Sequence, residues 1–212
     1  EICACLVGSE MCIRDSQYGT KILAQLFHPA YMAFPVPGTP QLIAPSCVGP
    51  YYAQSAPRPA TIEELHTIVD QFGQAAHRVQ IAGGDGVEIQ CAHAHGLLGG
   101  FLTPLYNKRA DEYGGSLDGR LRLCLEVIAS VRKYCGDDFI IDVRISGDEY
   151  SEGGLTLNDQ IYVCKQLEKV GVDFIHVSGG NTIKRGSSMP APGTSAAPHA
   201  HSSEEIKKHV NI

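Results

Sequence analysis

The sequence predicts an α/β fold built on a parallel sheet. Short apolar segments alternate with longer segments of helical periodicity from residue 21 to residue 180. The hydrophobic content of 43% and the charged content of 19% are ordinary for a globular chain. At 212 residues the chain is long enough for one sizeable core. It is short for a closed (β/α)8 barrel, which takes about 250 residues.

The first two elements are a strand and a helix separated by a proline-rich loop. Residues 21–28, "KILAQLFH", form a short apolar strand, and the loop then runs to Pro59. Thr61 followed three residues later by Glu64 is a capping box that begins a helix over 61–83. The helix carries apolar residues at helical spacing, namely Leu65, Ile68, Val69 and Phe72.

The remaining elements continue the alternation. After a strand and a long charged loop, helix and strand follow each other twice. We expect strands over 85–92, 139–146 and 173–180, and helices over 121–135 and 157–171. The last residues, 202–212, read as a helix that leads towards a further strand.

The charged loop, "NKRADEYGGSLDGRLR" over 107–122, has a structural explanation. Gly114 and Gly115 allow tight turns, Ser116 can cap the following helix, and Asp118 in its first turn is favoured by the helix dipole. We expect four charged side chains to neutralise one another, namely Arg109, Asp111, Glu112 and Arg120. We expect no catalytic role for Lys108, Arg109, Asp111 or Arg120.

Composition excludes several classes of partner. The net charge of -6 gives no basic face for nucleic acid, and no apolar run approaches the roughly 18 residues that span a bilayer. We therefore expect a soluble, cytoplasmic protein with no nucleic-acid or membrane partner; its oligomeric state stays open. Eight cysteines without paired spacing suggest reduced thiols, with Cys124, Cys135 and Cys164 as packing residues.

Residues 1–16, "EICACLVGSEMCIRDS", do not fit the rest of the chain. They have neither the charged start nor the cleavage site of a signal peptide, and they resemble translated sequencing-adapter read-through. Cys3, Cys5 and Cys12 lack the C-x2-C spacing of zinc sites. We expect this leader to be non-native and the native chain to begin near Gln17.

Polar residues interrupt the predicted strands, and they mark a candidate site. They are Gln25, Glu88, Gln90, Asp142, Arg144 and His176. A buried arginine is costly without a partner, so Arg144 needs a carboxylate or a ligand. One interpretation is an ion pair with Asp142 or Glu88 inside the sheet. The other is a ligand site at the carboxyl ends of the strands, where barrel enzymes keep their chemistry.

Three motifs resemble one known family. "DGVEI" with a histidine-containing turn, "FLTPLYNKRADEYGGSLDGRLR" and "VRIS" are similar to the flavin-dependent Old Yellow Enzyme family, the NADH:flavin oxidoreductases. The resemblance covers Lys21 to about Ile212. "RISGDEY" followed by "EGGLTL" is most similar to the longer dienoyl-CoA reductase, enoate reductase and bile-acid oxidoreductase members. It implies a partial (β/α)8 TIM barrel, about strands 3 to 6, with 17–212 as the central part of the flavin domain.

The resemblance also implies a cofactor site and a substrate site. Gln25 matches the glutamine that binds the flavin pyrimidine of FMN, and Arg144 matches the arginine beside flavin N1 and O2. The family's H-x-x-H or H-x-x-N pair corresponds to Gln90 and His93, and Gln90 cannot become a cation. Gly96 stands at the tyrosine position. His95 is therefore the first candidate proton donor, with Tyr106 or water as alternatives. Two interpretations of His176 stay open: a ligand contact in the same pocket, or a hydrogen bond within the barrel mouth.

The implied function is reduction of a C=C bond in an enoyl or dienoyl substrate, with NAD(P)H as reductant. A parent of the longer kind would carry a 4Fe-4S cluster and FAD downstream. We expect the chain to be a fragment that lacks the phosphate-binding loops after strands seven and eight. Two alternatives stay open: an amine dehydrogenase of the same family, and a metal-dependent hydrolase that uses His93 and His95.

Overall fold

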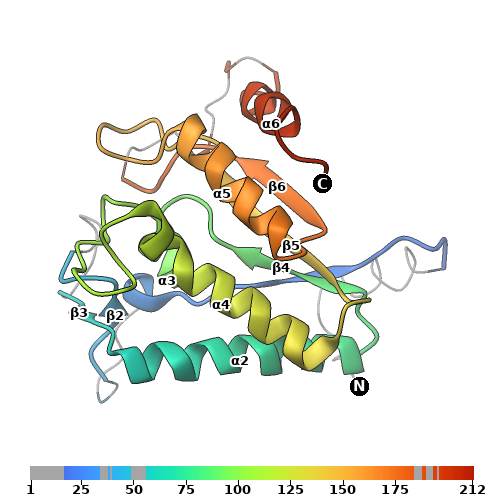
Figure 1. The fold of residues 1–212 in the computed structure, drawn as a ribbon, viewed down its shortest axis with the longest axis horizontal. Helices are drawn as coiled ribbons and strands as arrows, with labels where there is room; N and C mark the ends of the chain where they lie inside the picture. Colours follow the sequence, from blue (N-terminus) through green and yellow to red (C-terminus); the bar gives the residue numbers. More distant parts are fainter. Residues whose placement is uncertain are drawn as a thin grey trace.

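A computed structural model describes residues 17–33, 38, 40–48, 56–183, 188, 189, 193, 194 and 196–212. Its centre is a four-stranded parallel sheet in which the strands lie side by side in chain order (Figure 1). The strands are β1 (Leu23–Leu26), β4 (Gly86–Gln90), β5 (Ile140–Ser146) and β6 (Phe174–Ser178). Sequential parallel neighbours joined by helices are the repeating unit of a (β/α)8 barrel. The predicted α/β class and partial TIM barrel are confirmed.

Helices cover one face of this sheet. Figure 1 shows α2 (Ile62–Ile81), α4 (Leu117–Cys135) and α5 (Leu157–Lys169) on the same side, and α6 (Ala200–Lys207) lies beyond β6. The strand residues under the helices are fully buried, namely Val87, Ile89, Ile141, Val143 and Ile145. Their burial against the helices forms the centre of the core.

The other face of the sheet is the concave, barrel-interior face. Because successive side chains of a strand point to opposite faces, this face carries Gln25, Glu88, Asp142, Arg144, Phe174 and His176. Phe174 is 57% exposed. The strands are therefore not covered on both faces in the part of the chain that the structure describes, and they alternate between apolar and polar residues.

Local signals placed the helix starts. Thr61 and Glu64 form the predicted capping box of α2. The helix α4 starts at Leu117, directly after the predicted cap Ser116, whose side chain accepts a hydrogen bond from the backbone N–H of Gly119. Each predicted strand is shorter in the structure. The first strand, for example, was expected over 21–28, and β1 covers Leu23–Leu26.

A short helix, α3 (Gly96–Leu102), was missed by the sequence analysis. Its sequence GLLGGFL has three glycines, which hide the helical pattern, yet all seven residues are buried. The glycines allow close packing: a Cβ at Gly100 would come within 2.8 Å of the Tyr31 hydroxyl oxygen. Tertiary packing therefore stabilises a helix that intrinsic propensity disfavours. The 3-10 turn Ala30–Met32 and the short paired strands β2 (Ile43–Ala44) and β3 (Arg58–Pro59) within the proline-rich region were also missed.

The charged loop before α4 is held mainly by its own hydrogen bonds. The Asn107 amide donates to the carbonyls of Phe101 and Tyr113, each at 2.7 Å. Arg109 pairs with Asp111 at 2.5 Å, as predicted. Arg120 was expected to pair with an acid and instead donates to the backbone carbonyls of Leu102 and Gly115. The loop therefore depends on carbonyl acceptors as much as on charge neutralisation.

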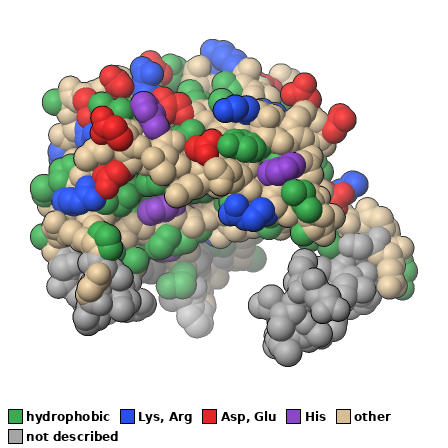
Figure 2. Space-filling view, turned by 90° about the horizontal axis from the view of Figure 1, so that it is seen from below, with side chains coloured by type: hydrophobic (Ala, Val, Ile, Leu, Met, Phe, Trp, Pro, Cys, Tyr) green, Lys and Arg blue, Asp and Glu red, His purple; other side chains and the backbone are tan. Residues whose placement is uncertain are grey.

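The cysteines that the structure describes are all free thiols. They include Cys124, Cys135 and Cys164, as predicted, together with Cys47 and Cys91. The leader, residues 1–16, lies outside the described residues. Among the residues described, no helix has the length and apolar character that crossing a bilayer requires. On the face drawn in Figure 2, acidic and basic side chains are interspersed.

Candidate functional site

Arg144 lies at the centre of the candidate site. It sits on β5 in register with Gln90 of β4 and His176 of β6. Its Nε is buried and has no hydrogen-bond partner. No ion pair joins Arg144 to Asp142 or Glu88 in the described part of the chain, so the predicted internal ion pair is wrong. A buried guanidinium nitrogen without a partner is costly, which favours the interpretation that a ligand supplies the acceptor.

The turn after β4 has an unusual backbone. His93 and Ala94 both have left-handed φ values, +67° and +50°, and Gly96 follows at +63°. Left-handed conformation costs a non-glycine residue about 1 kcal/mol or more, so the surroundings must hold the turn in place. They do so through a bridge between His93 and Asn181 and a hydrogen bond from Thr182 N to the His93 carbonyl at 3.0 Å.

His93 is held by two serines at the ends of β5 and β6. Its backbone N–H donates to Ser146 Oγ at 2.8 Å, and its Nε2 lies 3.3 Å from Ser178 Oγ. Its Nδ1 lies 3.4 Å from the Gly180 carbonyl oxygen. Burial, together with the charge of Arg144, lowers the pKa of His93 to about 4. The imidazole is therefore neutral at neutral pH and acts as a neutral hydrogen-bonding group.

This state of His93 can be measured directly. We expect the His93 ring to titrate in the folded chain with a midpoint near pH 4, well below its usual value of 6.5. Because the folded-state pKa is below the unfolded-state value, its stabilising contribution is present above pH 6.5 and is lost as the pH falls towards 4. Two-dimensional NMR of the histidine ring protons against pH checks this. A His93 midpoint near 6.5 would contradict the proposed environment.

Gln90 and His95 complete the polar groups around the turn. Gln90 is buried, and its Oε1 accepts from the backbone N–H of Ala92 at 3.2 Å, which directs the amide nitrogen away from that contact. His95 stacks on Phe27 with ring centroids 4.8 Å apart. Burial and then Arg144 lower the pKa of His95 as well. Arg144 acts on both histidines, so the structure brings His93, His95 and Arg144 into one site.

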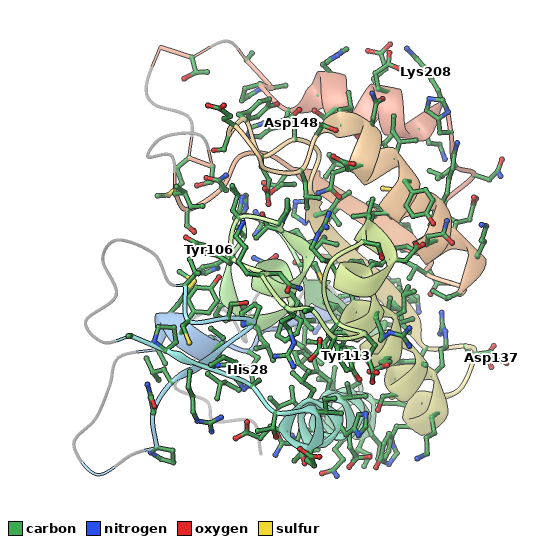
Figure 3. The ribbon with its side chains drawn as sticks, turned by 60° about the vertical axis from the view of Figure 1, so that its left-hand side comes forward. His28, Tyr106, Tyr113, Asp137, Asp148 and Lys208 are labelled. Carbon is green, nitrogen blue, oxygen red and sulfur yellow. The ribbon has the colours of Figure 1, made fainter. Side chains whose placement is uncertain are left out.

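Three other predicted positions have different surroundings. Gln25 lies exposed on β1, and its Nε2 donates to Glu88. Tyr106, labelled in Figure 3, is a core residue that packs edge-to-face on Tyr31, with centroids 5.4 Å apart. At Gly96 a Cβ would come within 2.3 Å of the Phe27 ring, so this backbone has no room for a tyrosine.

The sequence analysis missed the two serines that hold His93. Ser146 and Ser178 are paired in register at the ends of β5 and β6, and both are buried. The signal was present in "RIS" and "HVS", where each strand ends in a small polar residue. It could not be used from the sequence alone, because serine is common at strand ends and loops.

The histidine pair does not gather further metal-ligand groups among the described residues. The groups that approach one another with ligand spacing there are Glu88, Asp142 and His176. The metal-hydrolase alternative required additional ligands beside His93 and His95. The structure therefore gives that alternative no support within the described residues.

Comparisons with known proteins agree with the geometry. The sequence profile of the NADH:flavin oxidoreductase / NADH oxidase family matches residues 15–212. An NADH oxidase of Thermoanaerobacter brockii is 37% identical over 196 residues, covering 92% of this chain and 30% of the relative. An N,N-dimethylglycine/sarcosine dehydrogenase of Chromohalobacter salexigens is 36% identical over 165 residues, covering 77% of this chain and 24% of the relative.

A solved structure shows the same fold. Morphinone reductase superposes with a TM-score of 0.73 at 25% identity, covering 92% of this chain and 54% of that chain. The chain thus spans about half or less of the length of these three proteins. The profile match extends over nearly all of the chain and includes every strand and helix described above. The chain belongs to the NADH:flavin oxidoreductase / NADH oxidase family, also called the Old Yellow Enzyme family.

Proposed function

We propose that the whole protein is an FMN-dependent NAD(P)H oxidoreductase that reduces the C=C bond of an α,β-unsaturated enoyl or dienoyl substrate. The single observation that carries the proposal is the buried, unpartnered Nε of Arg144 beside two histidines of lowered pKa. Family membership supports the cofactor and the reductant. When bound, FMN supplies the chemistry of accepting a hydride from NAD(P)H and passing it on.

The residues of the chain fit the pyrimidine side of a flavin. Arg144 offers a fixed, always-protonated guanidinium, which stabilises the negative charge that develops on a reduced flavin. Gln25 lies on β1, two strands from β5 and on the same face, and its carboxamide offers both a donor and an acceptor. One N–H of its amide donates to Glu88, which leaves the second N–H and the side-chain oxygen for the flavin.

On the substrate side, Gln90 and His93 would hold the carbonyl oxygen. Both are neutral donors, so they polarise a carbonyl less than a cationic pair would. The ring contacts of His93, at 3.3 Å and 3.4 Å, are long enough that one can be exchanged for a substrate oxygen. We assign His95 as the proton donor, because it lies in the same site and Gly96 provides no hydroxyl.

An amine dehydrogenase of the same family is the second candidate. A specific observation favours it: Gln90 stands where a histidine is usual, and one relative is a dehydrogenase named for N,N-dimethylglycine and sarcosine. If the whole protein resembles the longer dienoyl-CoA and enoate reductases, we propose that it also carries a 4Fe-4S cluster and FAD.

The test begins with flavin binding by this chain. We expect saturable binding of FMN and of riboflavin, followed by visible absorbance and flavin fluorescence. Riboflavin lacks the phosphate, so its binding reports on the pyrimidine contacts alone. Equal riboflavin binding by the parent chain and by Arg144→Met would show that the site assigned to Arg144 is incorrect. NAD(P)H oxidation dependent on an enoate supports the ene-reductase, whereas flavin reduction by a simple tertiary amine without enoate supports the amine dehydrogenase.

A further inference from the structure

Three ligand-type side chains converge on the concave face of the sheet, below the proposed flavin site. Glu88, Asp142 and His176 come from the adjacent strands β4, β5 and β6. Each offers one ligand atom, and these atoms all lie within 4.8 Å of one another. Glu88 Oε2 and His176 Nδ1 are 2.7 Å apart. The arrangement brings two carboxylates and one imidazole to a single point.

Hydrogen bonding within the chain leaves this cluster incomplete. His176 and Gln25 satisfy Glu88, whereas Asp142 Oδ1 is buried and has no hydrogen-bond partner. An ion pair between Glu88 and His176 therefore accounts for the position of these two side chains. It leaves the Asp142 carboxylate without an explanation.

Two carboxylates face one guanidinium at the cluster, because Arg144 stands in register with His176. Arg144 follows Asp142 by two residues on the same face, which separates the two Cα atoms by about 7 Å. The two carboxylates of the cluster outnumber this one fixed positive charge.

We propose that Glu88, Asp142 and His176 bind a divalent first-row transition-metal ion of the Zn²⁺ type. Carboxylate oxygen and imidazole nitrogen are established zinc ligands at about 2.0 to 2.2 Å, which places neighbouring ligand atoms about 3 to 3.5 Å apart. The three atoms need small side-chain rotations to reach that spacing. His176 has a side chain that is 48% exposed, so water can reach the remaining coordination positions. Gln25, through its bond to Glu88, orients one ligand.

The experiment is a Zn²⁺ titration of the full chain by isothermal calorimetry, after exposed thiols such as Cys47 have been alkylated and metals removed with a chelator. We expect one equivalent to bind, and Glu88→Gln, Asp142→Asn and His176→Ala each to weaken binding by about tenfold or more. The visible spectrum of added Co²⁺ gives a second readout of oxygen and nitrogen ligation.

Matched controls separate the site from other surface groups. Glu152→Gln and His201→Ala change exposed residues outside the cluster and are expected to bind Zn²⁺ like the parent chain. Circular dichroism checks folding, and His176→Ala remains informative if Glu88→Gln does not fold, because His176 is half exposed. Equal affinity in the folded His176→Ala chain, or no saturable binding by the parent chain, would overturn the proposal. Neither result depends on flavin binding.

Discussion

Replacing Arg144 with methionine is expected to weaken flavin binding strongly and to leave the fold at least as stable as before. The guanidinium Nε is buried without a partner, so in the ligand-free chain it contributes desolvation cost without a compensating hydrogen bond. Methionine keeps most of the side-chain length and removes the charge. With flavin bound, the same substitution removes a charge-assisted hydrogen bond worth about 1.5 to 3 kcal/mol, or about 10- to 100-fold in affinity.

The measurement pairs a riboflavin titration with urea unfolding of the same protein. Arg144→Lys is the matched variant: it keeps a positive charge and loses the planar fork, so we expect intermediate affinity. The two readouts should move in opposite directions in Arg144→Met. Unchanged riboflavin affinity would remove Arg144 from the flavin site. A loss of several kcal/mol of stability would show instead that Arg144 has a structural partner within the fold.

Glu149→Gln is expected to stabilise the protein at alkaline pH and to have little effect at acid pH. Glu149 is 2% exposed in the loop after β5, where its Oε2 accepts from Thr103 Oγ1 and from the backbone N–H of Leu155, each at 2.8 Å. Burial raises the pKa of Glu149 from 4.5 to about 7, and the nearby Asp148 charge adds to the rise. The two hydrogen bonds and Arg120 oppose it only partly.

The sign of the effect follows from proton linkage. The folded state holds the Glu149 proton more tightly than the unfolded state, so this contribution to stability is present below pH 4.5 and is lost as the pH rises through about 7. The loss amounts to about 3 kcal/mol at full ionisation, at 1.36 kcal/mol per pKa unit. Glutamine keeps an acceptor for Thr103 and Leu155 and cannot ionise.

Urea unfolding of both proteins at pH 5 and pH 8 tests this prediction. We expect similar free energies of unfolding at pH 5, and at pH 8 a Glu149→Gln protein more stable by about 2 to 3 kcal/mol. The exposed neighbour Glu152→Gln is the control and should not alter the pH dependence. Comparing proteins at each pH cancels the opposite contribution of His93. An equal difference at both pH values would show that Glu149 is ionised in the fold.

Local sequence signals were enough to predict the helices and strands that they stabilise directly. The capping box of Thr61 and Glu64, the Ser116 cap and the apolar strand segments predicted α2, α4 and the sheet, because each depends on residues close in sequence. The helix α3 was not predicted, because Gly96 and Gly100 are explained by the side chains of Phe27 and Tyr31, far away along the chain. Arg120 was misassigned for the same reason, since its acceptors are backbone carbonyls that the fold places nearby.

The sequence by itself determined the parallel α/β class, the resemblance to a flavoprotein family and the polar residues at the strand ends. Only the tertiary structure decided how those residues pair. Glu88 could have paired with Arg144; the fold pairs it with His176 and Gln25 and leaves Arg144 Nε without a partner. The physical reason is that several of these pairings are chemically equivalent. Strand register and side-chain direction decide which one forms, and both depend on packing between distant segments.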